Sequence, residues 1–121
     1  MNHITFWEKK FGNSKTEYDF RGREVHKDCY GNEKSPYGWN IDHTQPEGEG
    51  GEDTDENKQI VNIATNREKG DKTTFVSDDG KTYQVQKRSG VERSTDSDRA
   101  KWANGYNYSG KKYRIVILEL K

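Results

Sequence analysis

The sequence predicts an α+β fold in a single domain, organised around a strand–strand–helix core at residues 38–72. Two short apolar runs, 39–41 and 59–63, are separated by a Gly-rich acidic loop, as expected for two paired strands. A polar segment that follows them has the cap signals of a short helix. A helical lead-in, 1–37, comes before this core, and residues 73–121 predict an antiparallel β extension.

Composition limits the size of the core. The 121 residues are 27% hydrophobic and 35% charged, and a chain of this length normally forms one domain. Three Trp, seven Tyr and four Phe compensate in part, because each aromatic side chain buries a large area. We therefore expect a folded domain with a small core and long polar loops.

The lead-in predicts a helix at 3–11, where Ile4, Phe6 or Trp7, and Phe11 are spaced to share an apolar face that packs on the core. A second helix is expected from about Gly22, which would place Arg23 and Lys27 on one face. Together with Arg21, these cations would contact phosphates or form a solvated face, and the sequence does not decide between the two.

The core begins with strand 39–41, which leads into Asp42 and His43. The acidic segment 47–56 lacks the regular ligand spacing of a calcium loop, so it is interpreted as a connector. After strand 59–63, Thr65 with Glu68 forms a capping-box pattern, and Gly70 would end the helix that they begin.

The tail predicts three strands, at 73–77, 81–88 and 113–120. Asp79-Gly80, between the first two, is a strong hairpin signal. In the long polar connection before the last strand, a cap at Ser94 or Thr95 would begin a short helix that includes Ala100 and Trp102.

The residues at the ends of the acidic loop suit phosphodiester hydrolysis. This reaction needs an activated water and neutralisation of charge on the phosphoryl oxygens. The imidazole of His43 can take the proton of the water, and Asp42 and Asn66 can offer oxygen ligands to a hard cation such as Mg²⁺. Neighbours on a regular strand point to opposite faces, so we expect the strand to end or distort at Asp42-His43.

The segments DH, ENKQI and TNREKGD, with a Gly-rich loop after the first, resemble the HNH endonuclease motif of the ββα-metal (His-Me finger) nucleases. The pattern is similar to the DH…N…N variant of small free-standing bacterial or phage HNH proteins. The resemblance implies that His43 is the general base, that Asn57 ties the loop to the strands and orients this base, and that Asp42 and Asn66 bind the metal. Asn62 is a weaker metal candidate.

The resemblance also implies the cofactor and the substrate. The cofactor would be Mg²⁺, with Mn²⁺ as an alternative, and no structural zinc is expected because paired CxxC motifs are missing. The substrate would be DNA, most simply double-stranded, and the contacts of such a site with the backbone are blind to base sequence. The candidate backbone contacts are the basic residues Arg21, Arg23, Lys27, Arg67, Lys69 and Lys72.

Two alternatives stay open. The net charge is zero and the segment 47–56 holds six acids without a base, which weakens attraction to DNA and favours an inactive nucleic-acid-binding or assembly module on the same fold. Residues 77–121 hold ten bases against six acids, so a local basic surface is still available. The other alternative is a nuclease toxin that an immunity protein inhibits.

The sequence also bears on the compartment. Cys29 is the single cysteine, which excludes an intrachain disulfide and favours a reducing compartment. No signal pattern and no run of about 18 apolar residues occurs, so we expect a cytoplasmic protein outside the membrane. The oligomeric state is not predicted.

Overall fold

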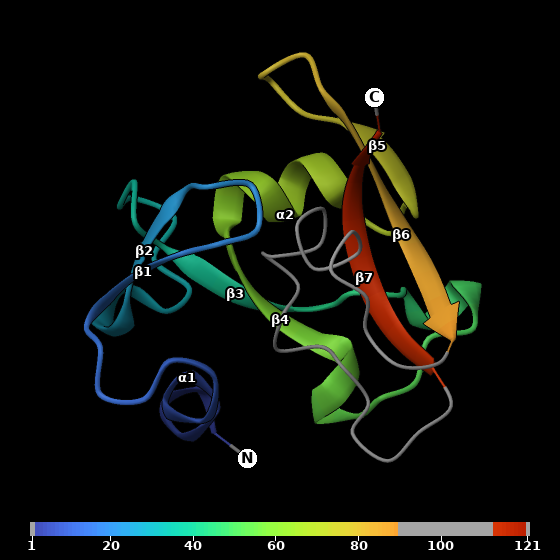
Figure 1. Cartoon of the computed structure of the whole chain (residues 1–121). Helices are drawn as coiled ribbons and strands as arrows, with labels where there is room; N and C mark the ends of the chain where they lie inside the picture. The colour runs from blue at the N-terminus through green and yellow to red at the C-terminus, as the bar shows by residue number, and fades with distance from the viewer. Residues whose placement is uncertain (1, 90–112, 121) are drawn as a thin grey trace.

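The structure, a computed structural model, describes residues 2–89 and 113–120 and has an α+β fold (Figure 1). All strand pairs named here are antiparallel: β1 with β2, β3 with β4, and β5-β6-β7 in that order. In chain order the helices and strands are α1 His3–Phe11, β1 Thr16–Tyr18, β2 Glu24–His26, β3 Trp39–His43, β4 Lys58–Asn62, α2 Ile63–Lys69, β5 Thr74–Val76, β6 Thr82–Ser89 and β7 Tyr113–Leu120.

Helix α1 confirms the helix predicted at 3–11, but Ile4 of the predicted apolar face is 37% exposed. Asn2 begins the helix, because its side-chain oxygen accepts a hydrogen bond from the Thr5 backbone N–H at 2.8 Å. Phe6 and Trp7 are buried against Trp39 of β3, together with other apolar side chains. The helix thus covers one side of the hairpin formed by β3 and β4.

The predicted helix from about Gly22 is wrong. Residues 24–26 form strand β2, which a 3₁₀ turn at Lys27–Cys29 follows, so Arg23 and Lys27 do not share a helical face. Two features favour the strand. Gly22 adopts a φ of 90° in a tight turn closed on Asp19, and the β-branched Val25 is fully buried.

The hairpin of β3 and β4 extends further than predicted. Strand β3 runs in regular register through Asp42 and His43, which pair with Gln59 and Lys58, and ends directly after His43. The pleat of β4 turns successive side chains to opposite faces. The hairpin therefore lies between α1 and the three-stranded sheet, as the view in Figure 1 shows.

Helix α2 begins two residues before the predicted cap. Asn62 is the N-cap, since its side-chain oxygen accepts from the Ala64 backbone N–H at 2.9 Å. The capping box of Thr65 and Glu68 is wrong, because the Thr65 hydroxyl donates to Asp19 instead. The helix ends at Gly70, as predicted, where φ is positive.

The C-terminal sheet confirms the three predicted strands. Gly80 has a φ of 79° in the turn between β5 and β6, which agrees with the predicted hairpin. The predicted helix at Ser94 or Thr95, with Ala100 and Trp102, falls outside the described residues. The sheet packs on the hairpin through a second core, formed by Phe20, Val61, Phe75, Tyr83, Val85, Ile115 and Ile117. Within 2–89 and 113–120, no helix has the length and apolar character needed to span a membrane.

An ion-paired carboxylate joins α2 to its neighbours. Glu68 accepts two hydrogen bonds from the Arg23 guanidinium, at 2.9 and 3.0 Å, and one from the Ser77 hydroxyl at 2.6 Å. These bonds stabilise the charged form, and the Arg23 guanidinium, the main cause, lowers the pKa of Glu68 from 4.5 to about 2. The pair connects the β1–β2 turn, α2 and the β5–β6 turn.

We expect Glu68→Gln to lower the free energy of unfolding at neutral pH and to leave this free energy unchanged in strong acid. A carboxylate whose pKa is lowered in the folded state stabilises the protein above its ordinary pKa, here 4.5, and this contribution is lost as pH falls toward about 2. Urea unfolding of both proteins across this range measures the difference. A difference that stays constant from pH 6 to pH 2 would contradict the assignment.

Candidate metal-binding site

A cavity of about 400 Å³ lies where β3 ends beside α2, and three of the predicted site residues line it: Asp42, His43 and Asn66. Asp42 and His43 are successive residues of β3, yet both reach the cavity, because the strand ends at His43. Among the described residues that line this cavity, His43 is the only basic one and several are acids, so the cavity suits a cation better than an anion. The other lining residues are Ile41, Pro46, Glu47, Gly48, Glu49, Gly70 and Asp71.

Asn57 holds the loop that closes the cavity. Its buried side chain accepts from the Gln45 backbone N–H at 2.9 Å and donates to the carbonyls of Gln45 and Glu52 at 2.9 and 2.8 Å. Its own carbonyl accepts from the Thr44 N–H at 2.7 Å. Asn57 thus ties the loop to the hairpin, which is the structural part of its predicted role. Its effect on His43 stays a prediction.

Asp42 is held by two donors. Its Oδ2 accepts a hydrogen bond from Gln59 Nε2 and forms an ion pair with Lys69 Nζ, each at 3.0 Å. Lys69 is fully buried, and its ammonium also donates to the His43 carbonyl at 3.1 Å. The prediction that Lys69 contacts DNA is therefore wrong: the side chain is inaccessible and serves as the counter-ion of Asp42.

His43 faces two acids of the loop. Its Nε2 lies 2.9 Å from Asp53 Oδ1 and 3.8 Å from Glu47 Oε1. The hydrogen bond with His43 is the main cause that lowers the pKa of Asp53, and Lys58 adds to the effect. One potential ligand atom from each of His43, Glu47 and Asp53 lies within 4.8 Å of the others, so these three could also hold a cation.

Sequence reasoning missed Glu47 and Asp53, because the loop was interpreted as a connector. A usable signal existed for Glu47, which follows His43 by four residues. No sequence pattern indicated Asp53, because its position beside His43 depends on how Asn57 holds the loop.

The other residues predicted to contact the DNA backbone form interactions within the protein or lie outside the cavity. Arg21 binds Ser77 and Asp78, and Arg23 binds Glu68, so these guanidinium groups stabilise the fold. Lys27 pairs with Glu8 at 2.9 Å. Arg67 and Lys72 are exposed at and just beyond the end of α2, with Arg67 paired to Glu33 at 2.8 Å.

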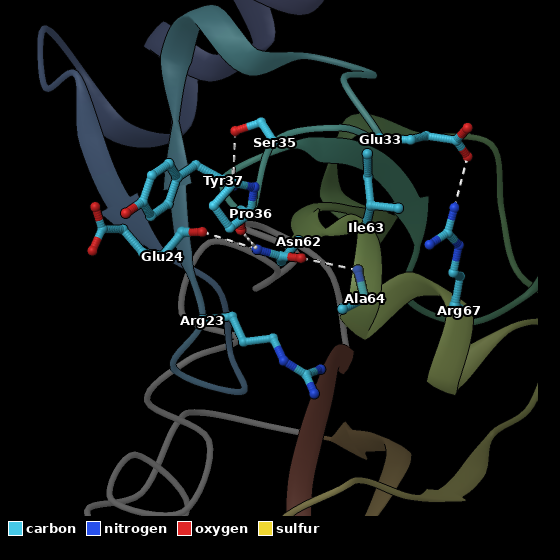
Figure 2. A pocket seen from close by; sticks show the side chains of 10 residues that line it. All are labelled: Arg23, Glu24, Glu33, Ser35, Pro36, Tyr37, Asn62, Ile63, Ala64 and Arg67. Atoms are coloured by element: carbon cyan, nitrogen blue, oxygen red, sulfur yellow. Dashed lines mark hydrogen bonds and ion pairs between the residues drawn. The ribbon is translucent and has the colours of Figure 1, made fainter.

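Asn62 belongs to a different cavity, also of about 400 Å³, at the start of α2 (Figure 2). Its amide donates to the carbonyls of Glu24 and Pro36 at 3.0 and 2.9 Å, while its oxygen caps α2. The Asn62 side chain is thus hydrogen-bonded to backbone groups of the protein and does not line the cavity beside Asp42. The weaker prediction that Asn62 binds the metal is therefore wrong. Asn62 sets where α2 starts, and hence where Asn66 lies.

No family model, no curated protein and no solved structure matches this chain.

We expect Lys69→Met to destabilise the protein by about 3 kcal/mol, because it leaves the Asp42 carboxylate without its buried counter-ion. Lys72→Met is the matched control, since it removes an exposed ammonium nearby and should change stability by less than about 0.5 kcal/mol. Denaturant unfolding of both variants and of Lys69→Met/Asp42→Asn measures the coupling. Equal effects of the two single substitutions would contradict the pairing.

Proposed function

We propose that the chain is a metal-dependent endonuclease of the HNH type that hydrolyses DNA phosphodiester bonds. The supporting observation is that Asp42, His43 and Asn66, distant in sequence except for the first two, line one acidic cavity. The order of the elements around it, two antiparallel strands and then a helix, agrees with a ββα-metal core.

The donor atoms fit a hard divalent cation. Asp42 offers a carboxylate oxygen and Asn66 an amide oxygen, and Mg²⁺ or Mn²⁺ prefers oxygen ligands. The hydrogen bond and the ion pair described for the Asp42 side chain both fall on Oδ2, so Oδ1 is the oxygen that would bind the cation. When bound, Mg²⁺ would neutralise charge on the phosphoryl oxygens.

Lys69 prepares Asp42 for this role. The buried ammonium lies 3.0 Å from the Asp42 carboxylate and balances its negative charge, and its bond to the His43 carbonyl fixes the end of β3. The carboxylate therefore has a fixed position before the metal arrives.

His43 would take the proton of the attacking water. Its Nε2 lies against the Asp53 carboxylate, an arrangement that favours a proton on Nε2 and leaves Nδ1 as the acceptor. Asp53 would then orient the imidazole, and Asn57 would hold the loop that carries Asp53. The proposal assigns general-base chemistry to His43 and positioning to Asp53 and Asn57.

The surroundings of the site bear on the substrate. Arg67 and Lys72 are the predicted cations that stay exposed close to Asn66 and Asp71, so they are the best candidates for DNA backbone contacts. Such contacts carry no base specificity. Double-stranded DNA in the cytoplasm is the substrate that we propose.

We expect the protein to nick supercoiled plasmid with Mg²⁺ or Mn²⁺, and this activity should disappear in EDTA. His43→Ala should reduce the rate by at least about 10²-fold, because the water loses its base. Asn66→Ala should raise the Mg²⁺ concentration needed for half-maximal rate. Gel electrophoresis of time courses gives the rates, and full wild-type activity in the chelator would exclude the mechanism.

Asp53→Ala should lower kcat about tenfold without raising KM for DNA, because the imidazole loses its orienting partner but DNA contacts are retained. Glu17→Ala is the control, since it removes one negative charge from β1, which does not line the cavity. Steady-state nicking kinetics separates the two constants. A rise of kcat in Asp53→Ala would mean that Asp53 blocks His43 instead.

A second candidate function is DNA binding without cleavage. It is favoured by the contacts that already engage both central groups, Asp42 with Lys69 and His43 with Asp53. A gel shift of duplex DNA without cleavage in Mg²⁺, Mn²⁺ or Zn²⁺ would support this function and oppose the first.

A further inference from the structure

A second group of metal-ligating side chains lies at the end of β2. His26 is the last residue of this strand, and Asp28 and Cys29 lie in the 3₁₀ turn after it. One potential ligand atom from each of the three lies within 4.8 Å of the others. None of these residues lines the cavity of Asp42, His43 and Asn66.

We propose that His26, Asp28 and Cys29 bind one Zn²⁺ ion, with water as the fourth ligand. An imidazole nitrogen, a thiolate and a carboxylate oxygen are the three ligand types that Zn²⁺ uses in proteins. Zn–ligand bonds of about 2.0 to 2.3 Å place neighbouring ligands roughly 3.5 Å apart, so small side-chain rotations would close the group around the ion. The Cys29 thiol would release its proton to solvent on binding.

The backbone holds the three residues in place before any ion binds. The Lys27 N–H donates to the carbonyl of Lys15, the residue before β1, at 3.0 Å, which holds the start of the turn beside this strand. The Cys29 carbonyl accepts from the Asn32 N–H at 3.1 Å, and Tyr30 forms a bridge with Trp39 of β3. Only side-chain rotations are therefore needed, which limits the entropy cost of binding.

The His26 ring is oriented in the way that is usual for a zinc ligand. Its Nε2 lies 2.5 Å from Glu24 Oε2, and its ring stacks on Tyr37 with centroids 3.9 Å apart. A carboxylate on one ring nitrogen fixes the tautomer and the orientation of the ring. Nδ1 is then the nitrogen that would bind Zn²⁺.

The Cys29 thiol is accessible to an ion from solvent. Cys29 is partly exposed, and its Sγ lies 3.5 Å from Asp28 Oδ1 and 3.7 Å from the Ser35 hydroxyl. Lys27, between the ligands in sequence, directs its ammonium to Glu8 at 2.9 Å instead of to Asp28. The Asp28 carboxylate is therefore not paired with Lys27, although Lys27 and Lys15 both line the hollow that contains His26 and Asp28.

The thiolate distinguishes this site from the acidic loop. His43, Glu47 and Asp53 could hold a cation only through nitrogen and oxygen. Co²⁺, which replaces Zn²⁺ in tetrahedral sites, gives a sulfur-to-cobalt charge-transfer band only where a thiolate binds it. The proposal is thus tested independently of DNA cleavage.

The experiment is a Co²⁺ titration of the reduced full chain followed by absorbance, with Zn²⁺ then added to displace the cobalt. We expect a charge-transfer band that saturates at one Co²⁺ per chain and disappears when Zn²⁺ is added. Cys29→Ser should abolish the band, and His26→Gln and Asp28→Asn should each weaken Co²⁺ binding at least tenfold.

Two controls complete the test. His43→Ala should keep the band, since it alters only the other group, and Glu33→Gln, which removes an exposed acid from the following loop, should keep it as well. Circular dichroism checks that each variant is folded, and Asp28→Asn carries the test if Cys29→Ser does not fold, because Asp28 is exposed. No band in the wild type, one Co²⁺ per two chains, or a band unchanged in both His26→Gln and Asp28→Asn would overturn the proposal.

Discussion

The buried carboxylate of Asp19 is the interaction on which the arrangement of the site depends. Asp19 is 3% exposed and accepts four hydrogen bonds, from the backbone N–H groups of Arg21, Arg23 and Asn62 and from the Thr65 hydroxyl. Burial raises the pKa of this carboxyl, and the four hydrogen bonds oppose that effect. The carboxylate thus joins the β1–β2 turn to the end of β4 and the first turn of α2. If this connection were lost, Asn66 and Lys69 would no longer be held beside Asp42.

Buried polar groups add to the stability that the small hydrophobic core provides. Only 27% of the residues are hydrophobic, and two compact clusters on either side of the hairpin contain most of the buried aromatic side chains. Between these clusters, Asn57, Gln59 and Lys69 are fully or almost fully buried and hydrogen-bonded. Because directional bonds fix these side chains, the same network that stabilises the hairpin also orients Asp42 and the loop over His43.

Local sequence patterns predicted helices, strands and turns well where one residue type determines the backbone conformation. Asp79-Gly80 and Gly70 each marked a turn or helix end that the structure contains, and the strands of the tail followed from this hairpin signal and from the apolar run at 113–120. The helix expected after Gly22 failed because the signal was a charge spacing, which is weaker than the burial of Val25 and the hydrogen bonds to Asp19. The N-cap of α2 was predicted at Thr65 for a similar reason. The local pattern does not show that the Thr65 hydroxyl donates to the distant Asp19 carboxylate.

The site was predicted in part. Asp42, His43 and Asn66 line one cavity, as their chemistry suggested, whereas Lys69 is a buried counter-ion instead of a surface cation. Its role could not be read from sequence, because burial of a lysine depends on the helix face that tertiary packing selects. The approach of Asp53 to His43 depends on a loop folded by Asn57, and no local pattern encodes such a long-range contact.

The most direct test of the central claim is a crystal structure of the protein soaked with Mn²⁺, with the ion located by its anomalous scattering. The account predicts a peak between Asp42 Oδ1 and the Asn66 side-chain oxygen, with the His43 imidazole facing a water on that ion or beside it. A peak on Glu47 and Asp53 with His43 as a ligand, and none at Asp42, would contradict the proposed mechanism. His43 would then bind the metal and could not act as the base.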